Sequence, residues 1–366
     1  MNTSPPATLL HKITDYQSIN ANSSSKGLIP SSRYNPAWLY KRPDANLFFT
    51  AVSVFTIQQL GPLLTADEQA IADRFIARAL PVYARFRNKD GLATYNFYGT
   101  NPSAHFPAGW LMHRFRHFQL PDDIDDTAMV YLTTIPLPDD LHFLSEKLAQ
   151  HANKTYLTNQ TTFLDYRHLR AYSTWFGRHM PIEFDACAIA NMLCVVYTYD
   201  LPQDTHALDS MTYLADIVQT NRYRTDPFTC APNYARSSLI QYHISRLIAT
   251  HDPAPLRPVR QQFIADLHTD FTRLTNRADQ LLIAISLLRL GETAPGDGLL
   301  DGTDADVVQF SFFIAGMLSV YPQPWVRQLA RHSFWHIRWQ CAAHNQVLLL
   351  EYMALNRAAK SALRGE

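Results

Sequence analysis

Four carboxylates fall within five consecutive positions of the stretch PDDIDDTAMVYL, residues 121–132. They are Asp122, Asp123, Asp125 and Asp126, and Pro121 places them at the entrance of a predicted helix. Free backbone N–H groups and the helix dipole favour anions there by about 0.3–1 kcal/mol, so some of the four can stay ionised as caps. A further carboxyl in a pocket that holds little water has its pKa raised by like charges and by desolvation. It then keeps a proton that it can give to a weakly basic substrate such as an alkene or an epoxide.

Two other interpretations of these residues stay open. Read as D-D-x-x-D, Asp122, Asp123 and Asp126 would coordinate Mg²⁺ and a substrate diphosphate, because hard cations prefer several carboxylate oxygens. Such clusters, in ionisation-type terpene synthases, work with a second motif of Asn, Ser or Thr and Glu at i, i+4 and i+8, which this sequence lacks. Alternatively, the acids only cap a helix and remain solvated.

The segment DIDDTAM resembles the D-x-D-D-T-A motif of class II terpene cyclases, a family that includes squalene-hopene cyclases and copalyl-diphosphate-type diterpene cyclases. In that family the middle aspartate protonates a terminal alkene or epoxide and starts a cascade of carbocation ring closures. The resemblance implies that Asp125 is the proton donor and that Asp123 and Asp126 position it and tune its acidity. Residues 174–197, TWFGRHMPIEFDACAIANMLCVVY, look like a later inner helix of bacterial relatives, which implies that Asn191 is a hydrogen-bond partner of Asp125.

The substrate is not fixed by the motif. The glutamine-tryptophan repeats of squalene-type cyclases and the acidic magnesium motif of some diphosphate-using members are missing, so a prenyl diphosphate and a squalene-like hydrocarbon both remain candidates. Mg²⁺ is expected only with a diphosphate, for which Arg42, Arg167 and Arg170 are candidate ligands. A carbocation is stabilised by aromatic faces, by about 2 kcal/mol or more when desolvated. Candidate lining residues are Tyr95, Phe97, Trp110, Trp175, Phe312 and Trp339.

A zinc site is an alternative. Protein prenyltransferase β-subunits bind Zn²⁺ through an Asp-x-Cys pair and a distant His, and this sequence has Asp185, Cys187 and His344. Such a set would leave one coordination position open for a substrate. In the other interpretation Asp185 caps a helix and Cys187 packs in the core.

The elements that must position these residues are predicted to be helices. Apolar residues recur at helical spacing along one side of residues 71–82 and 259–274, whereas residues 47–57, 184–197, 281–291 and 307–318 are apolar nearly all round. Gly and Pro breakers leave about a dozen helices, and strand signals are scarce. Alternation of one-sided and fully apolar helices predicts an all-α fold with an inner ring inside an outer ring, an (α/α)6-type toroid. A stacked helical solenoid is the alternative, but no repeated consensus is found. We expect a polar strap over residues 1–44, loop-like over 17–37, and a single toroid domain over 45–366.

Composition limits the partners. The sequence has 32 basic and 32 acidic residues and no basic run, so nucleic acid is not an expected partner. No segment has eighteen uncharged apolar residues in succession, which predicts a cytoplasmic protein without a transmembrane helix and leaves a peripheral membrane contact open. The four cysteines look like reduced core thiols. Cyclisation by protonation needs no redox cofactor. The alternative to an enzyme is a noncatalytic toroid that binds a lipid or a protein.

Overall fold

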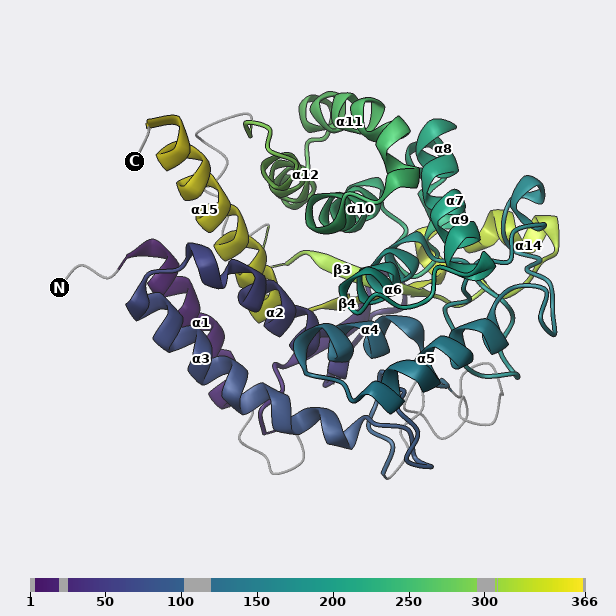
Figure 1. The fold of residues 1–366 in the computed structure, drawn as a ribbon, viewed down its shortest axis with the longest axis horizontal. Coiled ribbons are helices and arrows are strands. Elements are labelled where there is room, and N and C mark those ends of the chain that lie inside the picture. The colour runs from purple at the N-terminus through teal and green to yellow at the C-terminus, as the bar shows by residue number, and fades with distance from the viewer. Residues whose placement is uncertain (1–3, 20–25, 102–119, 295–306, 308, 365–366) are drawn as a thin grey trace.

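The computed structural model describes residues 4–19, 26–101, 120–294, 307 and 309–364. This part of the chain is mostly helical (Figure 1). The helices are α1 (Pro5–Ile19), α2 (Leu47–Leu60), α3 (Ala66–Ala79), α4 (Ile124–Thr133), α5 (Pro138–His151), α6 (Ala186–Thr198), α7 (Thr205–Gln219), α8 (Arg222–Thr225), α9 (Pro227–Cys230), α10 (Ser237–His251), α11 (Arg260–Arg273), α12 (Arg277–Arg289), α14 (Pro324–Ala330) and α15 (Ala342–Arg364).

A small antiparallel sheet corrects the all-α prediction. Its strands are β1 (Ser31–Asn35), β2 (Tyr40–Asp44), β3 (Ser311–Gly316) and β4 (His336–Gln340), in the order β2-β1-β4-β3. Arg33 of β1 lies opposite Trp339 of β4, so the sheet joins the two ends of the sequence. The loop expected over residues 17–37 therefore contains a strand.

The helix predicted over residues 307–318 is wrong, because residues 311–316 of that run form β3. A short, continuous apolar run fits a buried strand as well as a buried helix, and periodicity cannot separate the two. The other apolar runs are confirmed as helices. They correspond to α2, α6 and α12, and the one-sided patterns correspond to α3 and α11.

Several helices begin at a polar cap. Asn46, Asp123, Asp185 and Asn276 precede α2, α4, α6 and α12, and each side chain accepts a hydrogen bond from a backbone N–H of the first turn. Thr65 and Glu68 form a capping box at the start of α3, which packs against α2. These caps fix where the helices start, and two of them, Asp123 and Asp185, lie beside the candidate site.

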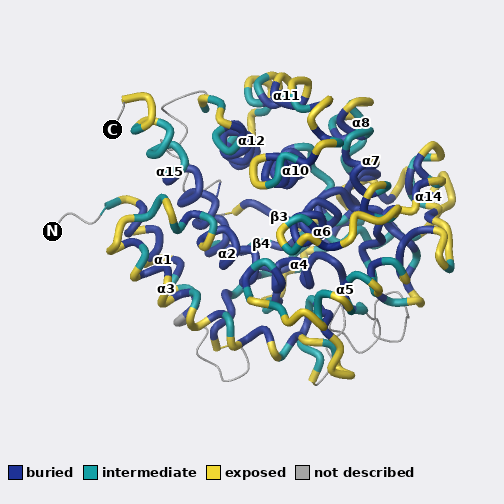
Figure 2. Tube along the Cα trace, viewed as in Figure 1, coloured by how far each residue is buried: buried dark blue, intermediate teal, exposed yellow. Residues whose placement is uncertain are grey.

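Six helices pack in succession. α2 contacts α4, α4 contacts α6, α6 contacts α10, α10 contacts α12, α12 contacts α15, and α15 contacts α2 again. In the view of Figure 1 these helices surround β3 and β4. Most of their residues are buried, whereas α3 and α11 are exposed on one side (Figure 2). α1, α3, α7 and α11 pack on the outside, against α15, α2, α6 and α12 respectively.

Candidate functional site

The acidic motif lies at the N-terminus of α4, held by two neighbouring segments. The backbone of Asp123 bridges Tyr95 on one side and Trp175 on the other, and Ile124 N donates to Thr174 O at 2.9 Å. Asp123 Oδ1 accepts from the N–H groups of Asp125 and Asp126 at 2.9 and 2.8 Å. Asp123 is therefore the N-cap of α4, and it fixes the first turn that carries the other two acids.

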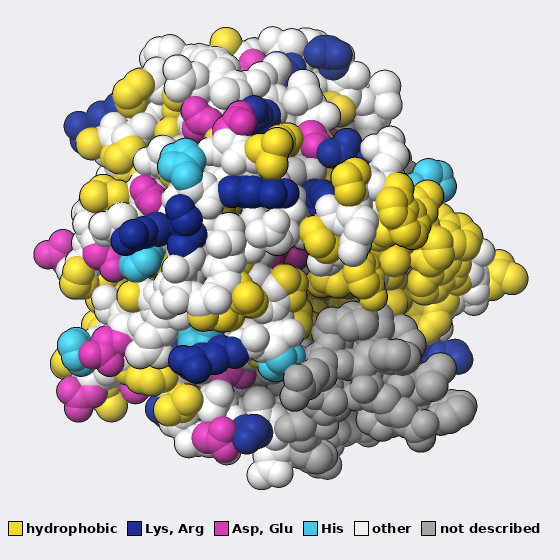
Figure 3. All heavy atoms as spheres, turned by 90° about the vertical axis from the view of Figure 1, so that its right-hand side faces the viewer, with side chains coloured by type: hydrophobic (Ala, Val, Ile, Leu, Met, Phe, Trp, Pro, Cys, Tyr) yellow, Lys and Arg dark blue, Asp and Glu magenta, His cyan; other side chains and the backbone are white. Residues whose placement is uncertain are grey.

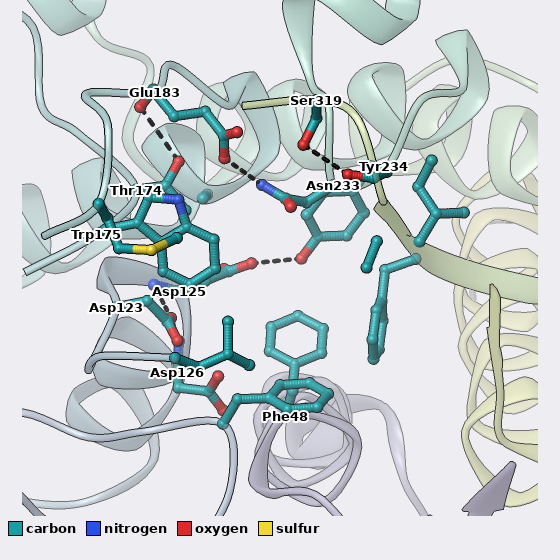
Figure 4. Close-up of a pocket in the computed structure, with 18 of the residues that line it drawn as sticks. Phe48, Asp123, Asp125, Asp126, Thr174, Trp175, Glu183, Asn233, Tyr234 and Ser319 are labelled. Atoms are coloured by element: carbon teal, nitrogen blue, oxygen red, sulfur yellow. Dashed lines mark hydrogen bonds between the residues drawn. The ribbon is translucent and has the colours of Figure 1, made fainter. Parts of the chain in front are cut away.

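Asp125 is buried, with 9% of its surface exposed, and it faces a cavity rather than the outer rim (Figure 4). Asn191 of α6 donates from Nδ2 to Asp125 Oδ1 at 2.6 Å. The hydroxyl of Tyr234, just before α10, donates to Asp125 Oδ2 at 2.5 Å. Behind Asn191, Arg246 of α10 donates from Nη2 to Asn191 Oδ1. Three helical segments thus meet at one carboxyl.

The site is electrostatically unusual because three acids share a buried volume. Desolvation raises the pKa of Asp125, and the hydrogen bonds from Asn191 and Tyr234 and the charge of Arg246 lower it in part. Desolvation also raises the pKa of Asp123 to about 8. For Asp126 desolvation and the charge of Asp123 raise the pKa well above its ordinary value. Burial therefore shifts all three carboxyls toward their protonated forms.

Asp122, by contrast, holds the fold together. Its Oδ2 accepts from Thr94 Oγ1 at 2.6 Å and from Asn88 Nδ2 at 2.5 Å, and its Oδ1 accepts from Asn96 Nδ2 at 3.3 Å. Asp122 does not line the cavity that Asp123, Asp125 and Asp126 share. The D-D-x-x-D interpretation needs Asp122 and Asp126 on one metal ion, and the bonds to residues 88–96 give Asp122 another role.

The cavity beside the acids has a volume of about 130 Å³. A cavity of about 150 Å³ is enough for benzene, so this space takes roughly one ring-sized unit, and the rest of a longer chain would have to extend beyond it. Its walls are mainly apolar and aromatic, with the acids gathered at one side (Figure 4). The aromatic residues that line it are Phe48, Phe97, Trp175, Tyr234, Phe313 and Trp339.

The predicted aromatic lining is reproduced in part. Phe97, Trp175 and Trp339 line the cavity. Tyr95 instead pairs through its backbone with Asp123, and Phe312 packs behind the wall against Phe48, Tyr234 and His344. Trp110 lies outside the described residues. Arg42, Arg167 and Arg170, the diphosphate candidates, are not among the lining residues.

The residues of the zinc alternative have other partners. Asp185 caps α6 through Oδ1, accepting from Cys187 N and Ala188 N, while its Oδ2 accepts from Asn233 N at 2.9 Å. His344 Nδ1 lies 3.1 Å from Ser53 Oγ. Within the described residues no three His, Cys, Asp or Glu side chains are grouped as metal ligands would be.

Several site residues were not found from the sequence. Tyr234 and Arg246 carry no motif, and only the approach of α10 to α4 and α6 brings them to Asp125. Phe48 sits in an apolar run that reads as ordinary core, and Phe313 belongs to the misassigned β3. Glu183 is buried on the cavity wall, and Asn233 Nδ2 donates to its Oε1 at 2.8 Å. For Glu183 the sequence offered one signal, an acidic residue two positions before Asp185, the N-cap of α6.

An exposed apolar surface continues from the cavity wall. Met317, Ser319 and Val320 line the cavity, and the chain that follows exposes large apolar side chains on α14 and its flanks. Figure 3 shows hydrophobic side chains gathered on this face. We call this the Trp325 surface; it comprises Tyr321, Trp325, Leu329 and Phe334, of which Trp325 is 70% exposed.

Comparisons with protein-family models, curated proteins and solved structures found no match. None of the helices in the described ranges is both long and apolar enough to cross a membrane.

Proposed function

We propose that the protein is a class II terpene cyclase-like enzyme that protonates an isoprenoid at Asp125. The observation that carries this is the position of Asp125: a buried carboxyl with a raised pKa, on the wall of an aromatic-lined cavity, with a donor on each oxygen. Asp125 is not the cap of its helix, because Asp123 is the N-cap of α4, and the Asp125 carboxyl lies on the cavity wall instead. It suits a substrate that water would not protonate at neutral pH.

The proposed step is a proton transfer to an alkene. The O–H bond of Asp125 breaks, the π electrons form a new C–H bond, and a carbocation remains on the substrate. Asn191 and Tyr234 stabilise the carboxylate as its charge develops, because both donors are already in place. Phe48, Phe313 and Trp339 offer electron-rich faces to the cation. Ring closure and transfer of a proton from a neighbouring carbon to a base beside the cavity then give an isomer of the substrate, and Asp125 regains a proton before the next turnover.

The architecture that goes with this proposal is an α/α toroid. Support comes from the succession α2, α4, α6, α10, α12 and α15, in which the last helix contacts the first, and from the helices that pack outside it. The sheet is an addition to that scheme. Its strands β3 and β4 contribute Phe313 and Trp339 to the cavity wall.

The test is a substrate panel. Purified protein is incubated in turn with farnesyl diphosphate, geranylgeranyl diphosphate and squalene, with and without Mg²⁺, and extracts are analysed by mass spectrometry. We expect a cyclic isomer from the wild type and none from Asp125→Asn. Asp139→Asn, which changes an exposed acid in the first turn of α5, should keep full turnover. Normal turnover by Asp125→Asn would refute the assignment, and a co-purified lipid without product would favour a binding protein.

A peripheral membrane contact is the second element of the proposal. An apolar isoprenoid resides in a bilayer, and aromatic side chains such as Trp325 and Tyr321 favour the membrane interface. The Trp325 surface follows directly on the cavity-lining residues 317–320, so it would bring the cavity close to the lipid. Flotation with phosphatidylcholine vesicles should recover the wild type and lose Trp325→Ser. Leu137→Ser removes an exposed leucine before α5 and should float normally, and equal flotation of both variants would reject this contact.

A further inference from the structure

Arg246 is a fully buried guanidinium in the middle of α10. Its Nη2 donates to Asn191 Oδ1, while its Nε and Nη1 have no hydrogen-bond partner within the described part of the chain. Its planar group lies 4.9 Å from the ring centroid of Phe55 and 5.3 Å from that of Tyr242. A buried cation normally has an anionic partner, because leaving it unpaired is costly.

The carboxylates around Arg246 are otherwise engaged. Glu351 of α15 accepts from Arg289 Nε at 2.5 Å and from the Tyr242 hydroxyl at 2.8 Å. No ion pair joins Arg246 to a carboxylate among the residues that the structure describes. The nearest link to an acid runs through Asn191, whose other end donates to Asp125. Asn191 thus accepts from the cation with its oxygen and donates to the acid with its nitrogen.

We propose that Arg246 is the positioning residue that, through Asn191, makes Asp125 a stronger acid and stabilises the carboxylate that remains after the proton has left. The polarity of the relay supports this. A guanidinium that donates to the amide oxygen withdraws electron density from the amide, which strengthens the hydrogen bond that Asn191 Nδ2 donates to Asp125 Oδ1. Before proton transfer the relay holds one uncompensated cation; afterwards it holds a cation and an anion. The negative charge that develops on Asp125 therefore supplies the anionic partner that Arg246 has not had before proton transfer.

Other titratable groups also surround Asp125 and Arg246. The groups near either residue are Asp123 and Asp126 at the start of α4, Glu183 and Asp185 just before α6, Cys187 and Cys194 of α6, Tyr234 before α10, Tyr242 and His243 of α10, Arg289 of α12, and His344 and Glu351 of α15. Desolvation lowers the pKa of His344 to about 3 and that of His243 well below its ordinary value, so neither imidazole competes with Arg246 as a cation at neutral pH. Arg246 is the cation that acts on Asp125.

The experiment measures the pKa of Asp125 directly, by carboxyl ¹³C NMR of aspartate-labelled protein, with the signal assigned by its loss in Asp125→Asn. Arg246→Met removes the charge and keeps an apolar side chain, and we expect the ionisation constant of Asp125 to fall by about tenfold or more. Arg246→Lys retains a cation and should recover part of this change. Asn191→Leu leaves Arg246 in place but breaks the relay, and it should produce a change of similar size.

A double-mutant cycle decides whether the effect passes through Asn191. If it does, Arg246→Met combined with Asn191→Leu should shift the ionisation constant no further than either change alone. Independent, additive shifts would overturn the relay, as would an unchanged ionisation constant in Arg246→Met. Should Arg246→Met fail to fold, the comparison of Arg246→Lys with Asn191→Leu is the test, and an unchanged constant in both refutes the inference.

The inference deepens the proposed function, and the two can fail separately. With a cyclisation substrate, Arg246→Met should lower kcat about tenfold at pH 6 and move the alkaline limb of the pH profile upward, because a weaker acid keeps its proton longer but gives it less readily. If no panel substrate is cyclised while the ionisation constant shifts as expected, the cyclase proposal fails and the relay stands. If cyclisation occurs and Arg246→Met leaves both the constant and the pH profile unchanged, the relay fails alone.

Discussion

Replacing Asp126 by Asn should make the protein more stable at alkaline pH and leave its stability unchanged at acidic pH. Asp126 is 2% exposed, its Oδ1 has no hydrogen-bond partner among the described residues, and a side-chain hydrogen bond links it to Asp123. Two buried carboxyls can share such a bond only if one of them keeps a proton. An asparagine at position 126 supplies the donor permanently, without a charge.

The magnitude follows from linkage. The folded-state pKa of Asp126 is raised well above its ordinary value of 3.8, and that of the bonded Asp123 is raised to about 8. Between the ordinary pKa of 3.8 and the raised pKa values the folded state binds more protons than the unfolded state, so the free energy of unfolding falls as pH rises, by about 1.4 kcal/mol per pH unit for each extra proton. From pH 5 to pH 8 one such proton therefore costs roughly 4 kcal/mol. Asp126→Asn removes this loss.

The assay is urea unfolding of the wild type and Asp126→Asn at intervals from pH 5 to pH 8.5, followed by circular dichroism. The free energies should lie closest at pH 5 and separate steadily above it, with the variant the more stable. Other buried acids, such as Asp185, titrate equally in both proteins and cancel in the difference. Asp139→Asn, an exposed change, should follow the wild type at every pH. A variant less stable than the wild type at pH 8 would show that Asp126 is ionised and stabilising, contrary to this reasoning.

Three further outcomes are expected. Gly27→Ala should lower the free energy of unfolding by about 2–3 kcal/mol, because the new Cβ would lie 2.4 Å from Arg78 O at a φ of +94°. Gly91→Ala is the control: its φ is +83° but the space around it is open, so it should cost about 1 kcal/mol, with both variants measured by thermal unfolding. Arg224→Ala should cost about 3 kcal/mol, because Arg224 binds Asp270 and Asp266 in a mostly buried pair, and Arg257→Ala, at an exposed pair, should change the free energy of unfolding by less than about 0.5 kcal/mol. Tyr234→Phe removes a donor from Asp125 Oδ2; turnover of a cyclised substrate should fall at least about tenfold while circular dichroism stays unchanged, and undiminished turnover would remove Tyr234 from the mechanism.

Local sequence determined the helices and their starts. The N-caps before α4 and α6 follow from aspartates at the boundary of an apolar run, since a carboxylate there satisfies the free N–H groups of the first turn whatever the helix packs against. The same local logic failed for residues 311–316. Their apolar run has no period that distinguishes a strand from a helix. Residues 311–316 form a strand because they pair with β4, a segment that lies outside the run itself.

Four carboxylates beside a proline at a helix entrance marked this stretch of the sequence, and the resemblance of DIDDTAM to the class II cyclase motif singled out Asp125 among them. The environment of Asp125 was not readable from the sequence. Whether Asp125 is a solvated cap or a buried acid depends on α6 and α10, which bring Asn191, Tyr234 and Arg246 to it from 66, 109 and 121 positions further along the chain. Ionisation is set by desolvation and by partners in space, and both are properties of the packed structure. The sequence therefore indicated which residue is the candidate acid, and only the tertiary structure decided that it is buried beside a cavity, with a cation behind it.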